Sequence, residues 1–493
     1  MRLFGLALPL LLRSAIVNAA YSLSDVEAQI SSHLARHAAY TAVSTPPSGC
    51  QLACGFLAFS LPSQLSYPNS SIYEFEESRY WAQQQALTRP ACRFSPASPE
   101  EVSLAVLTFR VTQCEFAVKS GGHAAFAGAS NIDDGVTIDL INLNQIALSP
   151  DKTQVSVGPG NVWYDVYNYL QPHNVTVIGG RVSAIGVVLA DGSIRQVSYS
   201  SPYSDLYWAL RGGGNNFGIV TRFDLAAYPQ GDLWAGSDTF LYTNQTAAAI
   251  NDAFYYLGIN APSDPYAQVI IAYAYAQSEN LFVIASDLQY TKPVANPPIL
   301  QNFTSVPGAI ASTLRITDLS NLTVEFNNSN PGGFRQTYWT FTVQNNAALM
   351  ADMVAIYMEE IEPIKNITGI GPSIIFQLIT TDMTDQFSKN GGNALGLAGQ
   401  GPLNLINVDI SWSNASDDDK VLAAAQNIVN RSVAVARAKG LDHPYLYQNY
   451  ASYQQDVFAS YGADNLAKLR SISAKYDPQR VWQKLQPGYF KLG

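Results

Sequence analysis

The 493-residue sequence has no long apolar run and no cluster of basic residues. No apolar stretch reaches the roughly 18 residues that a membrane-spanning helix needs, so we expect no membrane association. Only 13% of the residues are charged, and the formal net charge is −10. Nucleic-acid phosphates are bound by grouped Lys and Arg side chains, so we expect no nucleic-acid partner. Apolar residues make up 47% of the chain, which predicts a globular protein rather than a disordered one.

Cysteine is scarce, and its placement limits what it can do. The four cysteines, Cys50, Cys54, Cys92 and Cys114, all lie in the first quarter of the chain. In an oxidising compartment they can form two disulfide bonds, with three possible pairings that the spacing leaves open. A zinc site is the alternative, but no nearby histidine has a suitable spacing.

Two features of the sequence indicate the secretory pathway. Arg2 precedes the apolar run Leu3–Leu12, and small residues follow, so residues 1–20 are predicted to be a signal peptide. The chain also carries nine Asn-x-Ser/Thr sequons, which accept N-glycans only in that pathway. Their asparagines are Asn69, Asn174, Asn244, Asn302, Asn321, Asn327, Asn366, Asn414 and Asn430. We therefore predict a secreted glycoprotein.

The expected elements change in character near residue 230, and a chain of this length favours two domains. Before that point, short β-rich runs alternate with helices such as Pro99–Arg110, which indicates an α+β domain. After it, longer strands such as Arg335–Gln344 are joined by amphipathic helices. One of these is Asp417–Lys439, which we expect to begin after an N-cap at Ser416 and to end before Gly440. An antiparallel sheet covered by helices fits this region. The expected division is 21–230 with a core at about 86–230, then 231–440, then a segment 441–493 that returns to the first domain.

Three glycine-rich segments carry the functional signal. Ser120-Gly121-Gly122-His123 directly follows a predicted strand, and such a turn lets backbone N–H groups converge on a phosphate. Gly179-Gly180-Arg181 is a second predicted loop. A simple tight turn is the alternative interpretation of both. Gly212–Gly214 lies inside an apolar segment, where three glycines cost conformational entropy, so we expect the backbone to approach a ligand there.

In this order and spacing, the chain resembles the berberine-bridge-enzyme-like FAD-linked oxidases of the vanillyl-alcohol oxidase and p-cresol methylhydroxylase (PCMH) superfamily. The resemblance extends from about Tyr80 to the C-terminus. It is carried by "RPACRFSPASPEEVSLAV", "FAVKSGGH", "VSVGPGNVWYDVYNYL", "VLADGSI", "DLYWALRGGGNNFGIVTRF" and "YQNYA". It implies a PCMH-type FAD-binding domain followed by a substrate domain, with FAD as cofactor, a small-molecule substrate and O₂ as electron acceptor.

The resemblance also implies a role for individual residues. The N–H groups of residues 120–122 would bind the pyrophosphate, and the imidazole of residue 123 would be bonded covalently to the flavin 8α-methyl group. Tyr447 would be the catalytic base, although packing in a domain interface is the alternative for this side chain. Such a base must lose a proton whose reference pKa is about 10, so the site would have to stabilise phenolate. The residues implied to contact the cofactor are Ser120, Gly121, Gly122, His123, Gly179, Gly180, Gly218, Ile219, Val220 and Asn449.

One departure from the family pattern lies between Gly186 and Val187, where a glycine-rich segment of the family is absent. That segment supplies a second pyrophosphate contact and, in some members, a cysteine bonded to the flavin, which none of the four cysteines here can replace. Such a deletion is expected to leave strand edges unpaired. Two hypotheses follow. The first is an oxidoreductase that oxidises an alcohol, a sugar or a secondary-metabolite intermediate by hydride transfer to flavin N5. The second is a secreted flavin-free pseudoenzyme or a truncated gene model.

A third class, a glycoside hydrolase, would need paired carboxylates in a cleft. The acidic run Asp417–Asp419 is expected instead in the first turn of a helix, where negative charge is favourable.

Overall fold

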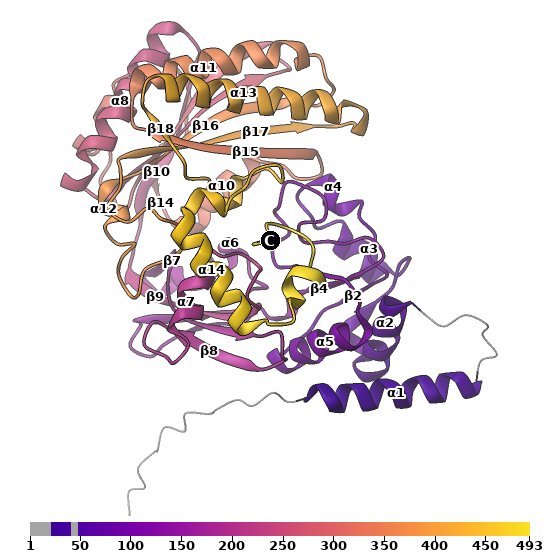
Figure 1. The fold of residues 1–493 in the computed structure, drawn as a ribbon. Helices are drawn as coiled ribbons and strands as arrows, with labels where there is room; N and C mark the ends of the chain where they lie inside the picture. Colours follow the sequence, from indigo (N-terminus) through magenta and orange to yellow (C-terminus); the bar gives the residue numbers. More distant parts are fainter. Residues whose placement is uncertain (1–20, 41–47) are drawn as a thin grey trace, which may run out of the picture.

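A computed structural model describes residues 21–40 and 48–493, so the predicted signal peptide lies outside the described residues. The chain forms an α+β protein, as predicted, with two lobes and the C-terminus between them (Figure 1). In the part of the chain that the structure describes, no helix is long and apolar enough to cross a membrane.

The first sheet lies in the N-terminal lobe and has the order β1-β2-β4-β3, with β2 and β3 parallel to β4. Helix α5 begins at Pro99 after the N-cap Ser98 and is buried along most of its length, because it packs against this sheet and against α2. The elements are α1 (Leu23–Tyr40), α2 (Gly49–Ser60), β1 (Leu65–Ser66), α3 (Ser71–Glu77), α4 (Gln83–Ala86), β2 (Cys92–Phe94), α5 (Pro99–Thr112), β3 (Phe116–Lys119) and β4 (Val136–Asp139).

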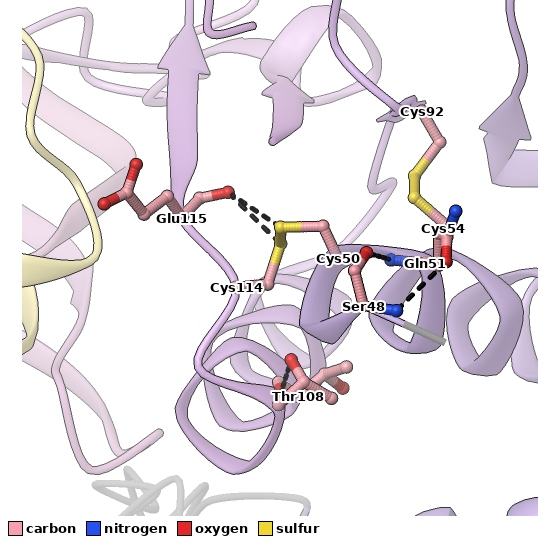
Figure 2. The surroundings of a disulfide bond; sticks show 9 residues. Ser48, Cys50, Gln51, Cys54, Cys92, Thr108, Cys114 and Glu115 are labelled. Atoms are coloured by element: carbon pink, nitrogen blue, oxygen red, sulfur yellow. Dashed lines mark hydrogen bonds between the residues drawn. A yellow bond between two sulfur atoms is a disulfide. The ribbon is translucent and has the colours of Figure 1, made fainter. Parts of the chain in front are cut away.

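The four cysteines form two disulfides, Cys50–Cys114 and Cys54–Cys92, which selects one of the three possible pairings (Figure 2). Both start from α2, one helical turn apart, and they tie this helix to the segment before β3 and to β2. Ser48 caps α2 by accepting from the Gln51 N–H, and the Gln51 side chain accepts from the Ser48 N–H in return. Because all four sulfur atoms are paired, the zinc alternative is wrong.

A buried ion network lies under the end of β3. The guanidinium group of Arg93 donates to Glu76, Glu77 and Asp139, and Lys119 donates to the same Asp139 carboxylate at 3.0 Å. Buried charges need partners of this kind, because an unpaired one costs several kcal/mol. The network therefore fixes the last residue of β3, from which the turn Ser120–His123 begins.

The second sheet is antiparallel, with the order β5-β6-β9-β7-β8. Its strands and helices are β5 (Ile146–Leu148), β6 (Gln154–Val157), α6 (Trp163–Leu170), β7 (Val175–Val188), β8 (Ile194–Ser198), α7 (Ser204–Leu210) and β9 (Ile219–Pro229).

Strand β7 corrects two expectations. Gly179 and Gly180 do not form a loop, because one strand runs from Val175 through both glycines to Val188. The join at Gly186–Val187 leaves no unpaired edge, because Val187 pairs with Arg195 of β8 and with Val220 of β9. β-branched residues on both sides of the join favour extended backbone. Strand β7 is longer than its partner β9, and three register shifts between the two strands accommodate the extra residues.

The third sheet forms the other lobe and is antiparallel, with the order β13-β10-β12-β11-β16-β17-β15-β18 and β14 beside β10. Its strands are β10 (Leu233–Leu241), β11 (Ala267–Ala276), β12 (Leu281–Tyr290), β13 (Ala309–Ser312), β14 (Arg315–Thr317), β15 (Arg335–Gln344), β16 (Gly371–Ile379), β17 (Leu403–Trp412) and β18 (Asp442–His443). The helices are α8 (Asn244–Asn260), α9 (Gln301–Thr304), α10 (Leu319–Ser329), α11 (Ala347–Ile361), α12 (Thr381–Thr384) and α13 (Asp418–Ala438).

The two faces of the third sheet differ, since successive side chains of a strand point to opposite faces. Trp339, Phe376 and Val408 pack under α8, α11 and α13 in the largest core, which confirms the predicted sheet covered by helices (Figure 1). The N-cap of α13 is Asp417 and not Ser416, because residues 415–417 form a 3₁₀ turn that leads directly into the helix. Gly440 follows the helix with φ +67°, as expected of a C′ glycine.

The C-terminal segment joins the lobes and contains α14 (Ala463–Tyr476) and α15 (Val481–Lys484). On one side, the Gln455 side chain hydrogen-bonds the backbone of Thr340 in β15. On the other, the Phe116 N–H donates to the Leu485 carbonyl, and Trp482 packs edge-on against the Phe116 ring. The face of the third sheet that α8, α11 and α13 do not cover, called here the uncovered face, is thereby held toward the N-terminal lobe.

Candidate active site

The turn Ser120–His123 follows β3, as the sequence predicted, and its backbone is open to a ligand. Gly122 has φ +69°, a conformation that favours glycine, and its carbonyl accepts from the Trp81 N–H. Among the described residues, none accepts a hydrogen bond from the N–H groups of Gly121, Gly122 or His123. A Cβ added at Gly121 would meet only Val162, at 3.8 Å. At Gly122 an added Cβ would meet Tyr80 at 3.0 Å, so the open space lies on the Gly121 side of the turn. Free N–H groups beside that space suit a phosphate, so the turn fits the pyrophosphate of FAD.

His123 presents its imidazole at the surface of the N-terminal lobe. The ring stacks on the indole of Trp81, with the centroids 4.4 Å apart and an interplanar angle of 18°. Surrounding protein atoms lower the pKa of His123 below its usual value, because they disfavour the charged form. At neutral pH the imidazole is therefore uncharged and retains a ring nitrogen with a free lone pair.

A row of aromatic rings connects His123 to the C-terminal segment. The Trp81 ring packs against the Tyr338 ring of β15, with the ring centroids 5.2 Å apart. The Tyr338 ring packs in turn against Tyr450, at a centroid distance of 5.7 Å. The Tyr450 ring packs edge-on against the Tyr447 ring, with the centroids 5.0 Å apart. Asn449 Nδ2 donates to the Tyr447 hydroxyl at 2.8 Å. The structure thus links three of the predicted site residues, His123, Tyr447 and Asn449, through Trp81, Tyr338 and Tyr450, none of which the sequence had indicated.

The environment of Tyr447 does not favour phenolate. Burial and the neighbouring Tyr450 raise the pKa of Tyr447, and the hydrogen bond from Asn449 offsets only part of that effect. A base at this position would need a further stabilising group, which a bound cofactor or substrate could supply. The role of Tyr447 as the base stays a prediction.

Asp409 of β17 is the titratable residue that sequence reasoning missed. It lies directly opposite Tyr338 of β15 and Ser373 of β16 in the strand register, on the uncovered face of the sheet. Asp409 is half-buried, and burial of its carboxyl group among protein atoms raises the pKa of Asp409 to about 7. Burial raises the pKa values of Tyr338 and Tyr450, and the negative charge of Asp409 raises them further. A carboxyl group that titrates near neutral pH is suited to accept a proton during catalysis.

A pocket of about 270 Å³ lies beside this row, between both lobes and the C-terminal segment. Tyr338 forms part of its wall, whereas Asp409 and His123 do not. The cation in its lining, Arg335, is held by two hydrogen bonds to Asp418. The wall therefore offers no unpaired charge and suits an uncharged ligand. Its lining includes Gln84, Ala125, Phe126, Ala127, Gln336, Thr337, Trp412, Ser452 and Tyr453.

The remaining glycine residues have different surroundings. Gly218 allows β9 to approach Val187 and Val188 of β7, and the Ile219 side chain is buried in the core, so only backbone there could meet a cofactor. At Gly213 and Gly214 an added Cβ would overlap Phe217 and Gln448. The expected close approach therefore occurs, but to protein rather than to a ligand. Cofactor contacts for Gly179, Gly180, Gly218, Ile219 and Val220 stay predictions.

Comparison with known proteins identifies the cofactor domain. A family model described as an FAD binding domain matches residues 90–198. Among curated proteins, an FAD-dependent monooxygenase of Fusarium proliferatum is 35% identical, with 90% of this chain and 95% of the relative covered. An FAD-dependent monooxygenase of Cochliobolus heterostrophus is 34% identical, with 92% and 96% covered.

The Fusarium alignment spans 498 positions but includes only 90% of this chain, so the relative has residues with no counterpart here.

Solved structures share the fold at low sequence identity. 6-Hydroxy-D-nicotine oxidase of Arthrobacter nicotinovorans matches with a TM-score of 0.70 at 15% identity, over 87% of this chain and 97% of the oxidase. A chitooligosaccharide oxidase matches with a TM-score of 0.67 at 18% identity, over 89% and 100%. A berberine-bridge-enzyme-like protein of Physcomitrella patens shares the fold as well, with a TM-score of 0.67 at 18% identity. With the family model and the two fungal relatives in agreement, this chain belongs to the family of fungal FAD-dependent monooxygenases.

Proposed function

We propose that this protein oxidises an uncharged hydroxylated small molecule, such as an alcohol, a sugar or a secondary-metabolite intermediate, with O₂ as the final electron acceptor. The observation that carries the proposal is Asp409, a carboxyl group with a pKa of about 7 on the sheet face that meets the His123 lobe. When bound, FAD would accept a hydride from the substrate carbon and pass two electrons to O₂.

The protein's own residues would perform the binding and proton steps. The N–H groups of Gly121, Gly122 and His123 would hold the pyrophosphate. The substrate hydroxyl would lie near Tyr447 and Tyr450, and its proton would pass to the Asp409 carboxylate. The pocket wall beside Tyr338, in which Arg335 is paired with Asp418, supports a neutral substrate, and solved sugar oxidases share the fold.

Covalent attachment of the cofactor through His123 is part of the proposal. A bond from the imidazole nitrogen would replace one C–H bond of the flavin 8α-methyl group and the N–H bond of the ring. The two electrons and two protons released would reduce one O₂ to H₂O₂. The uncharged imidazole at the open turn supports this role, because only a neutral ring has the lone pair that forms the bond.

A flavin-free chain is the second candidate, and one observation favours it. The relatives carry residues that this chain lacks, and β7 is continuous across the join where such residues are expected. A screen of alcohols, mono- and oligosaccharides and phenols for H₂O₂ release tests both candidates. Turnover of at least one class is expected, at rates of about 1–1000 per second for an ordinary enzyme. No release from any class, by protein that contains flavin, would contradict the oxidase proposal.

We also propose that the protein is secreted and N-glycosylated. All nine sequon asparagines are exposed, and two disulfides of this kind persist in oxidising compartments. Protein secreted from a fungal host should lose mass on treatment with an N-glycosidase, with Asn converted to Asp at several sequons by peptide mass spectrometry. Retention inside the cell with unmodified sequons would contradict this proposal.

A further inference from the structure

Trp81 lies at the boundary between the lobes and is bonded to both. Its backbone N–H donates to the Gly122 carbonyl at 3.2 Å, within the cofactor turn. Its backbone carbonyl accepts from the Gly333 N–H at 3.0 Å, and its indole N–H donates to the Asn330 carbonyl at 3.3 Å, both in the sheet lobe. The next residue, Ala82, forms a β-bridge with Phe334. The indole therefore cannot shift without disturbing one lobe or the other.

The same indole covers one face of the His123 imidazole, nearly parallel to it at 4.4 Å. The outer side-chain torsion of histidine has a broad energy profile, so an exposed imidazole does not hold one ring plane by itself. The lone pair of the reactive nitrogen lies in that plane. A neighbour that fixes the plane consequently fixes the direction in which the nitrogen can form a bond.

We propose that Trp81 is a positioning residue for His123, which holds the imidazole plane by stacking and makes that plane depend on the docking of the sheet lobe. The inference rests on the proposed covalent attachment through His123 and goes beyond it. Because Asn330 and Gly333 belong to the sheet lobe, the imidazole becomes correctly oriented only after both lobes have folded together. Covalent loading would then follow assembly of the substrate site rather than precede it.

Two substitutions separate stacking from simple packing. Trp81→Phe retains an aromatic ring that can stack, whereas Trp81→Leu fills part of the space without one. Flavin-free full-length protein is mixed with FAD, and the acid-precipitable share of the bound flavin is followed with time. We expect Trp81→Phe to load within a few-fold of the wild-type rate and Trp81→Leu to load about ten- to a hundredfold more slowly at equal total FAD binding. Equal loading rates for all three proteins would overturn the inference.

A second measurement decides the matter even if no covalent flavin forms in the wild type, or if Trp81→Leu folds poorly. The chain has five histidines, so NMR of histidine-labelled, flavin-free protein can follow each imidazole, with His123 assigned by a His123→Gln variant. In the wild type and in Trp81→Phe, we expect the His123 ring proton to be shifted upfield by the stacked ring. An unshifted His123 signal in the wild type would overturn the inference. Absence of acid-stable flavin with a shifted signal would instead contradict only the covalent attachment proposed above.

Discussion

Replacement of Asp409 by Asn is expected to lower kcat by about 10²- to 10⁴-fold, the usual contribution of a general base. The amide would keep the size of the side chain and its place opposite Tyr338, but it could not accept the substrate proton. The acidic limb of the wild-type pH profile should also disappear. In the wild type, activity is expected to rise as the pH increases through about 7, because Asp409 acts in its deprotonated form. The measurement is kcat against pH for both proteins.

The same substitution, Asp409→Asn, should raise stability at alkaline pH although it lowers activity. The folded-state pKa of Asp409 lies above its ordinary value of 3.8, so the folded protein holds a proton that the unfolded chain has lost. The corresponding stability is fully present below about pH 4 and is lost as the pH rises through about 7. An asparagine side chain cannot ionise, so Asp409→Asn should raise Tm at pH 8, by about 2 °C or more. The two melting temperatures should converge toward pH 4.

Asp287 of β12 provides the matched control. It is a half-buried carboxyl of the same sheet, and burial raises the pKa of Asp287 to about 6. It accepts from Ser237 and lies opposite Ser237 and Ile270 in the strand register rather than opposite a ring of the aromatic row. Asp287→Asn should therefore raise Tm at pH 8 with kcat unchanged. An equal loss of kcat in both variants would mean that Asp409→Asn lowers activity by disturbing the sheet and not by removing a proton acceptor. An unaltered kcat in Asp409→Asn would mean that Asp409 has no part in the mechanism.

Replacement of His123 by Ala is expected to release the flavin from acid-precipitated protein into the supernatant. The N–H groups of the turn remain, so FAD should still bind in native protein, but without a covalent bond. Because an alkylated flavin is a stronger oxidant, we also expect a lower reduction potential and a kcat reduced by about tenfold or more, equivalent to about 1.4 kcal/mol. The measurements are flavin absorbance of pellet and supernatant, and a reductive titration.

His173→Ala is the control for this prediction, since His173 lies on the N-terminal lobe, contacts Tyr169 and has no proposed role. Its flavin should remain in the pellet. If flavin stays with the pellet in His123→Ala as well, another residue forms the bond and the assignment of His123 is wrong.

The sequence predicted the fold class and the position of the glycine turn because both depend on local patterns. Strand β15 has the expected bounds, since its apolar periodicity defines it. The turn at Ser120 follows its strand as expected. The disulfide pairing could not be predicted, because it depends on how α2 lies against β2 and β3.

Asp409 and Trp81 were missed for a related reason. In "NLINVDISW" the alternation of apolar and polar residues indicates a strand with one uncovered face, but not that this face meets another lobe. Trp81 precedes a short helix and belongs to no motif, and its importance comes from contacts with Asn330 and Gly333, about 250 positions along the chain. The β7 loop was predicted wrongly because the glycines were given more weight than the β-branched residues around them.

The central claim, that this chain binds FAD despite the join at Gly186–Val187, is tested most directly by the absorbance of the purified wild-type protein at the flavin bands, before and after acid precipitation. We predict a yellow protein with about one flavin per chain whose colour remains in the pellet. Flavin that appears only in the supernatant would mean that the protein binds FAD but forms no covalent bond with it. A colourless protein that also fails to take up added FAD would contradict the claim and leave a flavin-free protein with the fold of an oxidase.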